Sequence, residues 1–243
     1  MKKYITIGSL CILMMSCAPM IKKQEFAPKM YVEHPVTILV LPPINKSTAA
    51  DAKEYYTTTV AEPLTNSGYY VYPLEVVNDI LKQEGLFETE SYAHIPPQKF
   101  KDFFNADAVL YVTILQWNTS YYVTGGNVSV KVACELKSTK TGEVLWFYDD
   151  VVVVNTSGDS GGNGGLAGFL IQAATTAIKT ATQDYVPLAK EVNQKIFLAM
   201  PYGKYHPQFN KDGQMEVVKK GNVKSPTSRP VKSTGSKSTT KAK

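Results

Sequence analysis

The chain has 243 residues and a net charge of +5. Hydrophobic residues make up 44% of the chain, and aromatic residues make up 11%. This composition supplies enough apolar side chains for one packed domain with tails, and it excludes a wholly disordered chain. After the first 16 residues, no stretch approaches the 18 or more uninterrupted apolar residues of a membrane-spanning helix.

The N-terminus has the pattern of a lipoprotein signal. Lys2 and Lys3 precede an apolar stretch that ends at Met15, and the small residue Ser16 stands directly before Cys17. Cleavage after residue 16 would leave Cys17 as the acylated N-terminus. As a helix, the apolar stretch would span about 18 Å, which is too short for a hydrocarbon core about 30 Å thick. We therefore predict a signal peptide at 1–16, lipidation at Cys17 and a tether at 17–35.

The residue after the cysteine bears on location. Ala18 is not the acidic residue that marks inner-membrane retention in enteric bacteria, and no acidic run follows it. These features favour attachment to the outer membrane with the protein facing the periplasm.

The three cysteines have separate expected fates. Cys11 leaves with the signal and Cys17 is acylated, so Cys134 has no partner for a disulfide within the mature chain. Cys134 lies on the apolar side of an alternating pattern, which predicts a buried thiol. An intermolecular disulfide is the alternative.

Residues 36–104 alternate between short β-branched runs and helical patterns. The pattern predicts strands at 36–41 and 69–72 and helices at 47–68, 73–85 and 96–104. Ser47 or Thr48 is a candidate cap for the first of these helices, and Pro63 should bend its end. A strand, a helix and a further strand favour a right-handed parallel unit.

Beyond residue 105 the pattern changes to successive strands. We expect strands at 108–115, 128–136 and 143–154, a Gly-rich loop at 157–165, and a long helix from 166 to about 200 that is broken near Pro187. The hairpin around Gly125 and Gly126 is predicted to be short. Together these elements predict one α/β domain at 36–200 that resembles a three-layer structure. Its mixed sheet has a parallel half and antiparallel strands, and its last element is the long helix.

The start of that long helix is unusually apolar. Residues 166–178 read LAGFLIQAATTAI, which predicts a helix packed on the sheet. The functional alternative is a contact with another subunit or with a membrane through Leu166, Phe169, Leu170 and Ile171.

The C-terminal residues 201–243 form a basic tail that we expect to be disordered. Eight positive charges and no acid lie between Lys219 and Lys243. Subtracting these and the two signal lysines leaves residues 17–218 with a net charge of −5. The tail is either solvated or in contact with anionic envelope polymers or headgroups. The compartment argues against nucleic acid.

No catalytic, metal or cofactor site is predicted. Residues 158–162 read GDSGG, the string around a trypsin-like nucleophile, but Ser160 has no suitably placed His34 or His94 to complete a triad. The same loop lacks the Gly-Lys-Ser/Thr sequence of a P-loop. The three histidines lie at or near prolines, and no pair has metal-ligand spacing.

Four separated segments resemble a known family. They read ILVLPPINKS (38–47), GYYVYPLEVVNDILKQEGL (68–86), ADAVLYVTILQWNTSYYV (106–123) and TGEVLW (141–146). The chain resembles the bacterial lipoproteins that include a meningococcal vaccine-candidate surface antigen, over roughly residues 36–200. The resemblance implies a fold similar to the TolB N-terminal domain and to the periplasmic domain of CsgG. It also implies outer-membrane attachment, self-association and no established enzymatic activity.

These observations favour a non-enzymatic envelope lipoprotein that self-associates as a scaffold or accessory factor for assembly or secretion, with a CsgG-like lipoprotein as a candidate partner. One alternative is a subunit of an outer-membrane translocation pore, which would need hairpin strands of about 10 residues. The other is a hydrolase of envelope polymers.

Overall fold

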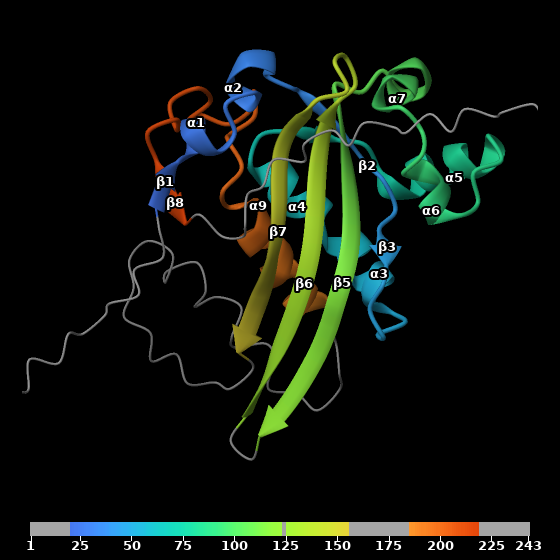
Figure 1. Ribbon diagram of the computed structural model, residues 1–243, viewed down its shortest axis with the longest axis vertical. Coiled ribbons are helices and arrows are strands. Elements are labelled where there is room, and N and C mark those ends of the chain that lie inside the picture. The colour runs from blue at the N-terminus through green and yellow to red at the C-terminus, as the bar shows by residue number, and fades with distance from the viewer. Residues whose placement is uncertain (1–19, 123–124, 156–184, 219–243) are drawn as a thin grey trace, which may run out of the picture.

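The computed structural model describes residues 20–122, 125–155 and 185–218 (Figure 1). A mixed sheet in the order β4-β2-β5-β6-β7, with β3 also paired to β5, forms the centre, and β1 and β8 make a separate two-stranded ribbon. The strands are β1 (Met20–Lys22), β2 (Thr37–Val40), β3 (Ile44–Asn45), β4 (Tyr70–Val71), β5 (Ala108–Tyr122), β6 (Gly125–Ser138), β7 (Val144–Asn155) and β8 (Glu216–Val218). The helices are α1 (Lys23–Phe26), α2 (Met30–Glu33), α3 (Ala52–Thr59), α4 (Ala61–Asn66), α5 (Leu74–Gln83), α6 (Thr89–Tyr92), α7 (Pro97–Phe104) and α9 (Val186–Phe197).

The parallel half of the sheet forms as predicted. Strand β2 pairs in parallel with β4 on one side and with β5 on the other. The consecutive prolines 42 and 43 end β2, because proline has no N–H for the ladder. The chain then pairs with β5 again at β3, where Ile44 lies opposite Thr113.

The antiparallel half is longer than predicted. Strands β5, β6 and β7 have 15, 14 and 12 residues, so the expectation of a short hairpin is wrong. A register shift between Ile114 and Gln116 turns Trp117 back towards the buried face. The extension was not predicted from the sequence, because the bulge interrupts the two-residue alternation of buried side chains. The apolar face of β6 is buried from Val128 to Leu136, as predicted.

Helices α3 and α4 carry the predicted apolar stripe of Ala52, Tyr56, Val60 and Leu64, and all four residues are buried. The helix divides at Val60, because Pro63 cannot donate a hydrogen bond to the carbonyl of the preceding turn.

The predicted cap for this helix is not made. The N-cap is Asp51, and it makes no side-chain capping bond. The Ser47 hydroxyl instead donates to Asn45 Oδ1 at 2.7 Å. Ser47 therefore stabilises the loop before the helix rather than the first turn of the helix.

Helices α5 and α7 form close to their predicted limits. Pro73 precedes α5, and Gly85 follows it with a φ of +80°, a conformation that suits glycine. In α7, Phe100 and Phe104 are buried whereas Phe103 is half exposed. These helices bury their apolar faces against one side of the sheet.

The core lies on both faces of the sheet, which confirms the mixed α/β fold. Helices α3, α4 and α9 cover one face of the sheet, and α5, α6 and α7 cover the other face near β2 and the start of β5 (Figure 1). Successive side chains of β2 point to opposite faces of the sheet. Ile38 therefore packs in the larger apolar cluster and Leu39 in the smaller one. Helix α9 begins at Val186 with Pro187 in its first turn. The rest of the predicted long helix, at 166–184, lies outside the described residues.

The expected domain boundaries at 36 and 200 need correction. Residues 20–35, predicted as a tether, contain three short elements with Lys23, Ala27 and Met30 buried. Residues 201–218, predicted as part of the tail, pack against the same end of the domain. The backbones of Gly68 and Gly203 approach so closely that a side chain at either position would collide with the other segment. The sequence of these segments has no helical or strand period. Long-range contacts hold them in place, and such contacts leave no local pattern in the sequence.

None of the helices in the described part of the chain is both long enough and apolar enough to cross a membrane.

Candidate functional site

Two polar junctions meet at helix α2, which supplies Tyr31 to one and Glu33 to the other, and we define each by its residues. The brace consists of Glu33, Thr37, Asp107 and the turn 138–141. The clasp consists of Lys23, Tyr31, Tyr202 and Asp212. Both join segments that are far apart in the sequence.

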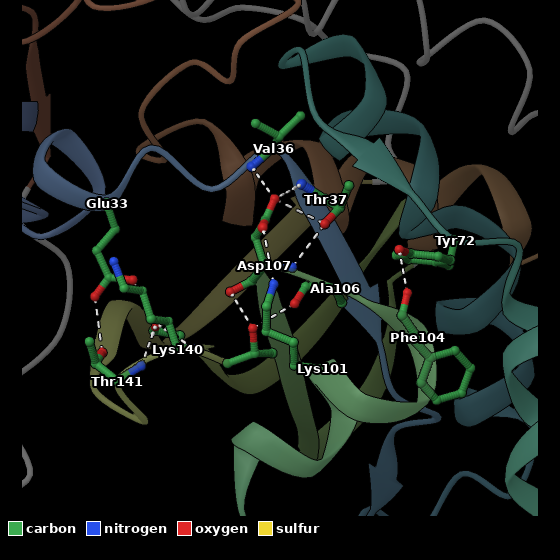
Figure 2. Close-up of polar contacts among 12 residues, drawn as sticks. Glu33, Val36, Thr37, Tyr72, Lys101, Phe104, Ala106, Asp107, Lys140 and Thr141 are labelled. Atoms are coloured by element: carbon green, nitrogen blue, oxygen red, sulfur yellow. Dashed lines mark hydrogen bonds and ion pairs between the residues drawn. The ribbon is translucent and has the colours of Figure 1, made fainter.

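The carboxylate of Asp107 is the centre of the brace (Figure 2). Its Oδ2 accepts the backbone N–H groups of Val36 and Thr37 and the Thr37 hydroxyl, each at 3.0 Å. The Thr37 hydroxyl oxygen in turn accepts the Asp107 N–H at 2.8 Å. This exchange fixes the start of β2 against the start of β5. Lys101 Nζ lies 3.8 Å from the other carboxylate oxygen, Oδ1.

Glu33 extends the brace to the turn between β6 and β7 (Figure 2). Its two carboxylate oxygens accept the hydroxyls of Ser138 at 2.6 Å and Thr141 at 3.0 Å. The Ser138 hydroxyl oxygen also accepts the N–H groups of Lys140 and Thr141. Glu33 thereby ties the end of α2 to a turn about 105 residues further along the chain.

The same turn is tied to β5 by a second hydroxyl. Thr139 Oγ1 is within 2.5 Å of the Ala106 carbonyl oxygen and 2.9 Å of the Asp107 carbonyl oxygen. The donors and acceptors of the brace thus satisfy one another. Chemically, this arrangement stabilises the fold and presents no activated nucleophile or base.

The clasp contains a buried ion pair. Lys23 Nζ lies 3.3 Å from Asp212 Oδ2, and the side chains are 2% and 0% exposed. Burial lowers the pKa of Lys23, and the nearby Asp212 carboxylate partly opposes this effect. Lys23 Nζ also donates to the Met200 carbonyl oxygen at 2.9 Å and lies 4.1 Å from the centre of the Tyr202 ring.

Asp212 receives two further hydrogen bonds. The Tyr31 hydroxyl donates to Oδ1 at 3.0 Å, and the Tyr202 N–H donates to Oδ2 at 2.9 Å. Burial and the Asp212 charge both raise the pKa of Tyr31, so that the phenol stays protonated. The clasp therefore joins the N-terminal segment to the C-terminal segment, because the Lys23 ammonium and the Asp212 carboxylate each contact several groups.

The β1–β8 ribbon continues this closure to the ends of the described chain. Met20 pairs with Val218 and Lys22 with Glu216, in antiparallel register. The Lys23 N–H donates to the Met215 carbonyl at 2.9 Å, and the Gln24 N–H donates to the Gly213 carbonyl at 3.1 Å. The two ends of the domain consequently leave it at the same place.

Cys134 is buried on the apolar face of β6, as predicted. Its sulfur lies 3.6 Å from the Tyr56 hydroxyl, and burial raises the pKa of the thiol to about 12. A thiol this deeply buried and protonated is a poor nucleophile. An intermolecular disulfide, the alternative considered from sequence, is incompatible with the folded position of Cys134.

Two of the three histidines make contacts with aromatic rings. His34 contacts the ring of Phe209 edge-on, with centroids 5.4 Å apart, and His206 stacks on Tyr202 at 3.7 Å. Across the residues described, no group of three or more His, Cys, Asp or Glu side chains could hold a metal ion.

Several residues singled out from sequence lie outside the described residues. They are Cys17, Ser160, Leu166, Phe169, Leu170, Ile171 and the basic tail from 219 onward. Sequence reasoning in turn missed the brace and the clasp. Asp107 stands directly before a predicted strand, and Asp212 precedes Gly213 as in many turns. Neither signal indicates the distant partners, because Val36 lies 71 residues from Asp107 and Lys23 lies 189 residues from Asp212 in the sequence.

The comparisons with known proteins agree with the resemblance found in the sequence. A curated relative, "Putative lipoprotein NMB1124/NMB1162" of Neisseria meningitidis serogroup B, is 30% identical over 183 residues, which cover 75% of this chain and 84% of the relative. The crystal structure of lipoprotein GNA1162 from Neisseria meningitidis is 31% identical, with a TM-score of 0.47, and the match covers 59% of this chain and 98% of that one.

Two more distant solved structures are also similar. The PelC dodecamer from Paraburkholderia phytofirmans is 14% identical with a TM-score of 0.40, and the match covers 67% of this chain and 86% of that one. The LpoB C-terminal domain from Salmonella enterica is 18% identical with a TM-score of 0.34, and the match covers 54% and 95%. The family model "Putative lipoprotein GNA1162-like" matches residues 29–203, well over half of the chain. The chain therefore belongs to the GNA1162-like lipoprotein family.

Proposed function

We propose that this lipoprotein is anchored in the outer membrane through Cys17, faces the periplasm, and acts as a self-associating, non-enzymatic scaffold or accessory factor in envelope assembly or secretion. The observation that carries the proposal is the closure of both domain ends beside the anchor. Met20, three residues after Cys17, pairs with Val218 near the other end of the described chain. A domain fastened in this way presents the rest of its surface to partners.

The hydrogen bonds made by the buried and half-buried polar groups support a scaffold role over an enzymatic one. The Glu33, Asp107 and Asp212 carboxylates accept hydrogen bonds from protein donors, and the Cys134 thiol is buried. Catalytic acids, bases and nucleophiles must instead reach a substrate. These residues are occupied in holding distant segments together.

Mass spectrometry of crosslinked native envelopes tests the proposal, with wild type compared with Cys17→Ala. We expect the wild-type chain in the outer-membrane fraction, with an acyl mass on its first mature residue and crosslinks to itself and to an envelope partner such as a CsgG-like lipoprotein. The Cys17→Ala chain should lose both the acyl mass and the membrane attachment. Recovery of unmodified wild-type chain as an uncrosslinked monomer would contradict the proposal.

Self-association through the apolar segment has its own test. Replacing Phe169 and Leu170 with Ser should reduce the crosslinked oligomer, because apolar contact area drives such association. Phe87→Ser is the matched control, since Phe87 is 71% exposed and lies between α5 and α6. Equal losses in both variants would exclude residues 166–171 as the specific contact.

A further inference from the structure

A small pocket lies where four parts of the fold meet. It is lined by the loop before α3, the start of α3, the extended end of β5 and the start of α9. The larger side chains that line it are Asp51, Tyr55, Trp117, Thr119 and Tyr185. Its volume of about 140 Å³ is below the roughly 300 Å³ at which sites for drug-sized ligands begin. The pocket therefore suits one small chemical group.

The position of the pocket follows from the strand order. Strands β2 and β5 are parallel neighbours, and β3 continues the path of β2 along β5. The chain runs from β3 through α3 and α4 to β4 on one side of β2, whereas β5 is followed by β6 on the other side. Ligands of open α/β sheets bind beyond the carboxyl ends of the strands at such a reversal of direction. The pocket lies at this reversal, between the loop after β3 and the second half of β5.

Three aromatic rings line the pocket. The centre of the Tyr55 ring lies 6.2 Å from that of Trp117 and 5.5 Å from that of Tyr185, with interplanar angles of 35° and 49°. The rings are thus inclined to one another rather than stacked. Trp117 is only 5% exposed, so core packing fixes its position. The register shift between Ile114 and Gln116 gives its side chain this direction.

The loop before α3 is held by its own hydrogen bonds. Asn45 Nδ2 donates to the Ala49 carbonyl oxygen at 2.7 Å, and Asn45 Oδ1 accepts the Ser47 N–H at 3.0 Å. Ala49 and Ala50 line the pocket with small side chains. Asp51 follows them as the exposed N-cap of α3 and makes no side-chain capping bond. Among the described residues that line the pocket, Asp51 is the only one with a charged side chain, so the pocket is negative.

We propose that this pocket binds a small organic cation that carries an alkylated ammonium group. The face of an aromatic ring attracts a cation, and several inclined rings can surround a quaternary ammonium group whose methyl groups bury apolar surface. The Asp51 carboxylate supplies the counter-charge. The same carboxylate repels phosphate, so an ammonium group that is linked to a phosphate, as in a phospholipid headgroup, binds more weakly.

Fluorine NMR of the full mature chain with Cys17→Ser, labelled with 5-fluorotryptophan, tests the proposal. The chain has two tryptophans, and Trp146 is 2% exposed and does not line the pocket, so its signal is an internal control. We expect choline to shift the Trp117 signal with a Kd on the order of 1 mM. The uncharged isostere 3,3-dimethyl-1-butanol should bind about tenfold more weakly, because it lacks the cation. Phosphocholine should also bind more weakly than choline.

Two matched pairs of variants locate the binding. Tyr55→Leu should weaken choline binding roughly tenfold and Tyr55→Phe should retain it, because the ring face contacts the cation. Asp51→Asn should weaken binding roughly fivefold, as expected for an exposed ion pair. Asp79→Asn, which removes an exposed carboxylate on α5, should leave binding unchanged. Because Asp51 is exposed, Asp51→Asn tests the site even where thermal unfolding shows that Tyr55→Leu is destabilised.

Three results would overturn the inference: equal binding of choline and its uncharged isostere, equal shifts of the two tryptophan signals, or equal effects of Asp51→Asn and Asp79→Asn. Tighter binding of phosphocholine than of choline would also overturn it, because the ligand would then be recognised through its anion. None of these measurements involves a membrane, so their outcome is independent of the proposed anchoring at Cys17.

Discussion

The brace and the clasp both join distant segments through a carboxylate, yet they differ in burial and in relation to the family. The central brace carboxylate, Asp107, is 40% exposed, whereas the clasp carboxylate, Asp212, is fully buried. The brace residues lie within the family match at 29–203, whereas Lys23 and Asp212 lie outside it. The brace therefore holds the domain through partly solvated polar contacts, whereas the clasp joins its two ends through a buried ion pair.

The largest effect is expected from Asp212→Ala. This substitution leaves the Lys23 ammonium buried without its counter-charge, so the free energy of unfolding should fall by about 3–5 kcal/mol. Urea denaturation followed by circular dichroism measures this change.

The double variant Lys23→Met with Asp212→Leu serves as the control for Asp212→Ala. Because it removes both charges and keeps apolar volume, it should recover much of the stability. A loss below about 1 kcal/mol in the single variant would show that the pair is solvated in the folded state.

A smaller loss is expected from Asp107→Ala in the brace. The N–H groups of Val36 and Thr37 lose a charged acceptor, but water can reach the site and satisfy them in part. The free energy of unfolding should fall by about 1–3 kcal/mol in the same denaturation experiment. Asp102→Ala, which removes an exposed carboxylate 3.9 Å from Lys99, is the matched control and should change it by less than about 0.5 kcal/mol. A loss from Asp107→Ala as large as that from Asp212→Ala would remove the distinction between brace and clasp.

The pH dependence of the clasp is tested with Tyr31→Phe. Because the pKa of Tyr31 is raised above its ordinary value of 10.0, its contribution to stability is present below pH 10 and is lost as the pH rises further. Tyr31→Phe should cost about 1 kcal/mol at neutral pH and should decline less steeply than wild type above pH 10. Denaturation curves between pH 8 and 11 would measure both quantities, and parallel declines would contradict the assignment.

The smallest effect is expected at the surface near the brace. Lys29 and Glu143 form an ion pair at 3.0 Å with side chains that are 46% and 55% exposed. Glu143→Gln should lower the free energy of unfolding by no more than about 0.5 kcal/mol, and added salt should remove that difference. A larger, salt-independent loss would mean that the brace extends beyond the carboxylates of Glu33 and Asp107.

Elements with a strong local pattern were predictable, and elements held by distant contacts were not. The stripe from Ala52 to Leu64 and the alternation from Val128 to Leu136 both report burial through their own spacing, and both were located correctly. The extension of β5 past Leu115 was missed, because a bulge breaks the alternation there. The segments at 20–35 and 201–218 were taken for a tether and a tail, because short helices and turns carry no period.

By itself, the sequence determined the family, the mixed α/β fold and the identity of most core residues. Each depends on residue types and spacings within a few turns or strands. Only the tertiary structure decided that Lys23 forms an ion pair with Asp212 and that Met20 pairs with Val218. These contacts join positions separated by 189 and about 200 residues. Local conformational preferences contain no information about such pairings, which depend on the tertiary fold that brings the two ends of the domain together.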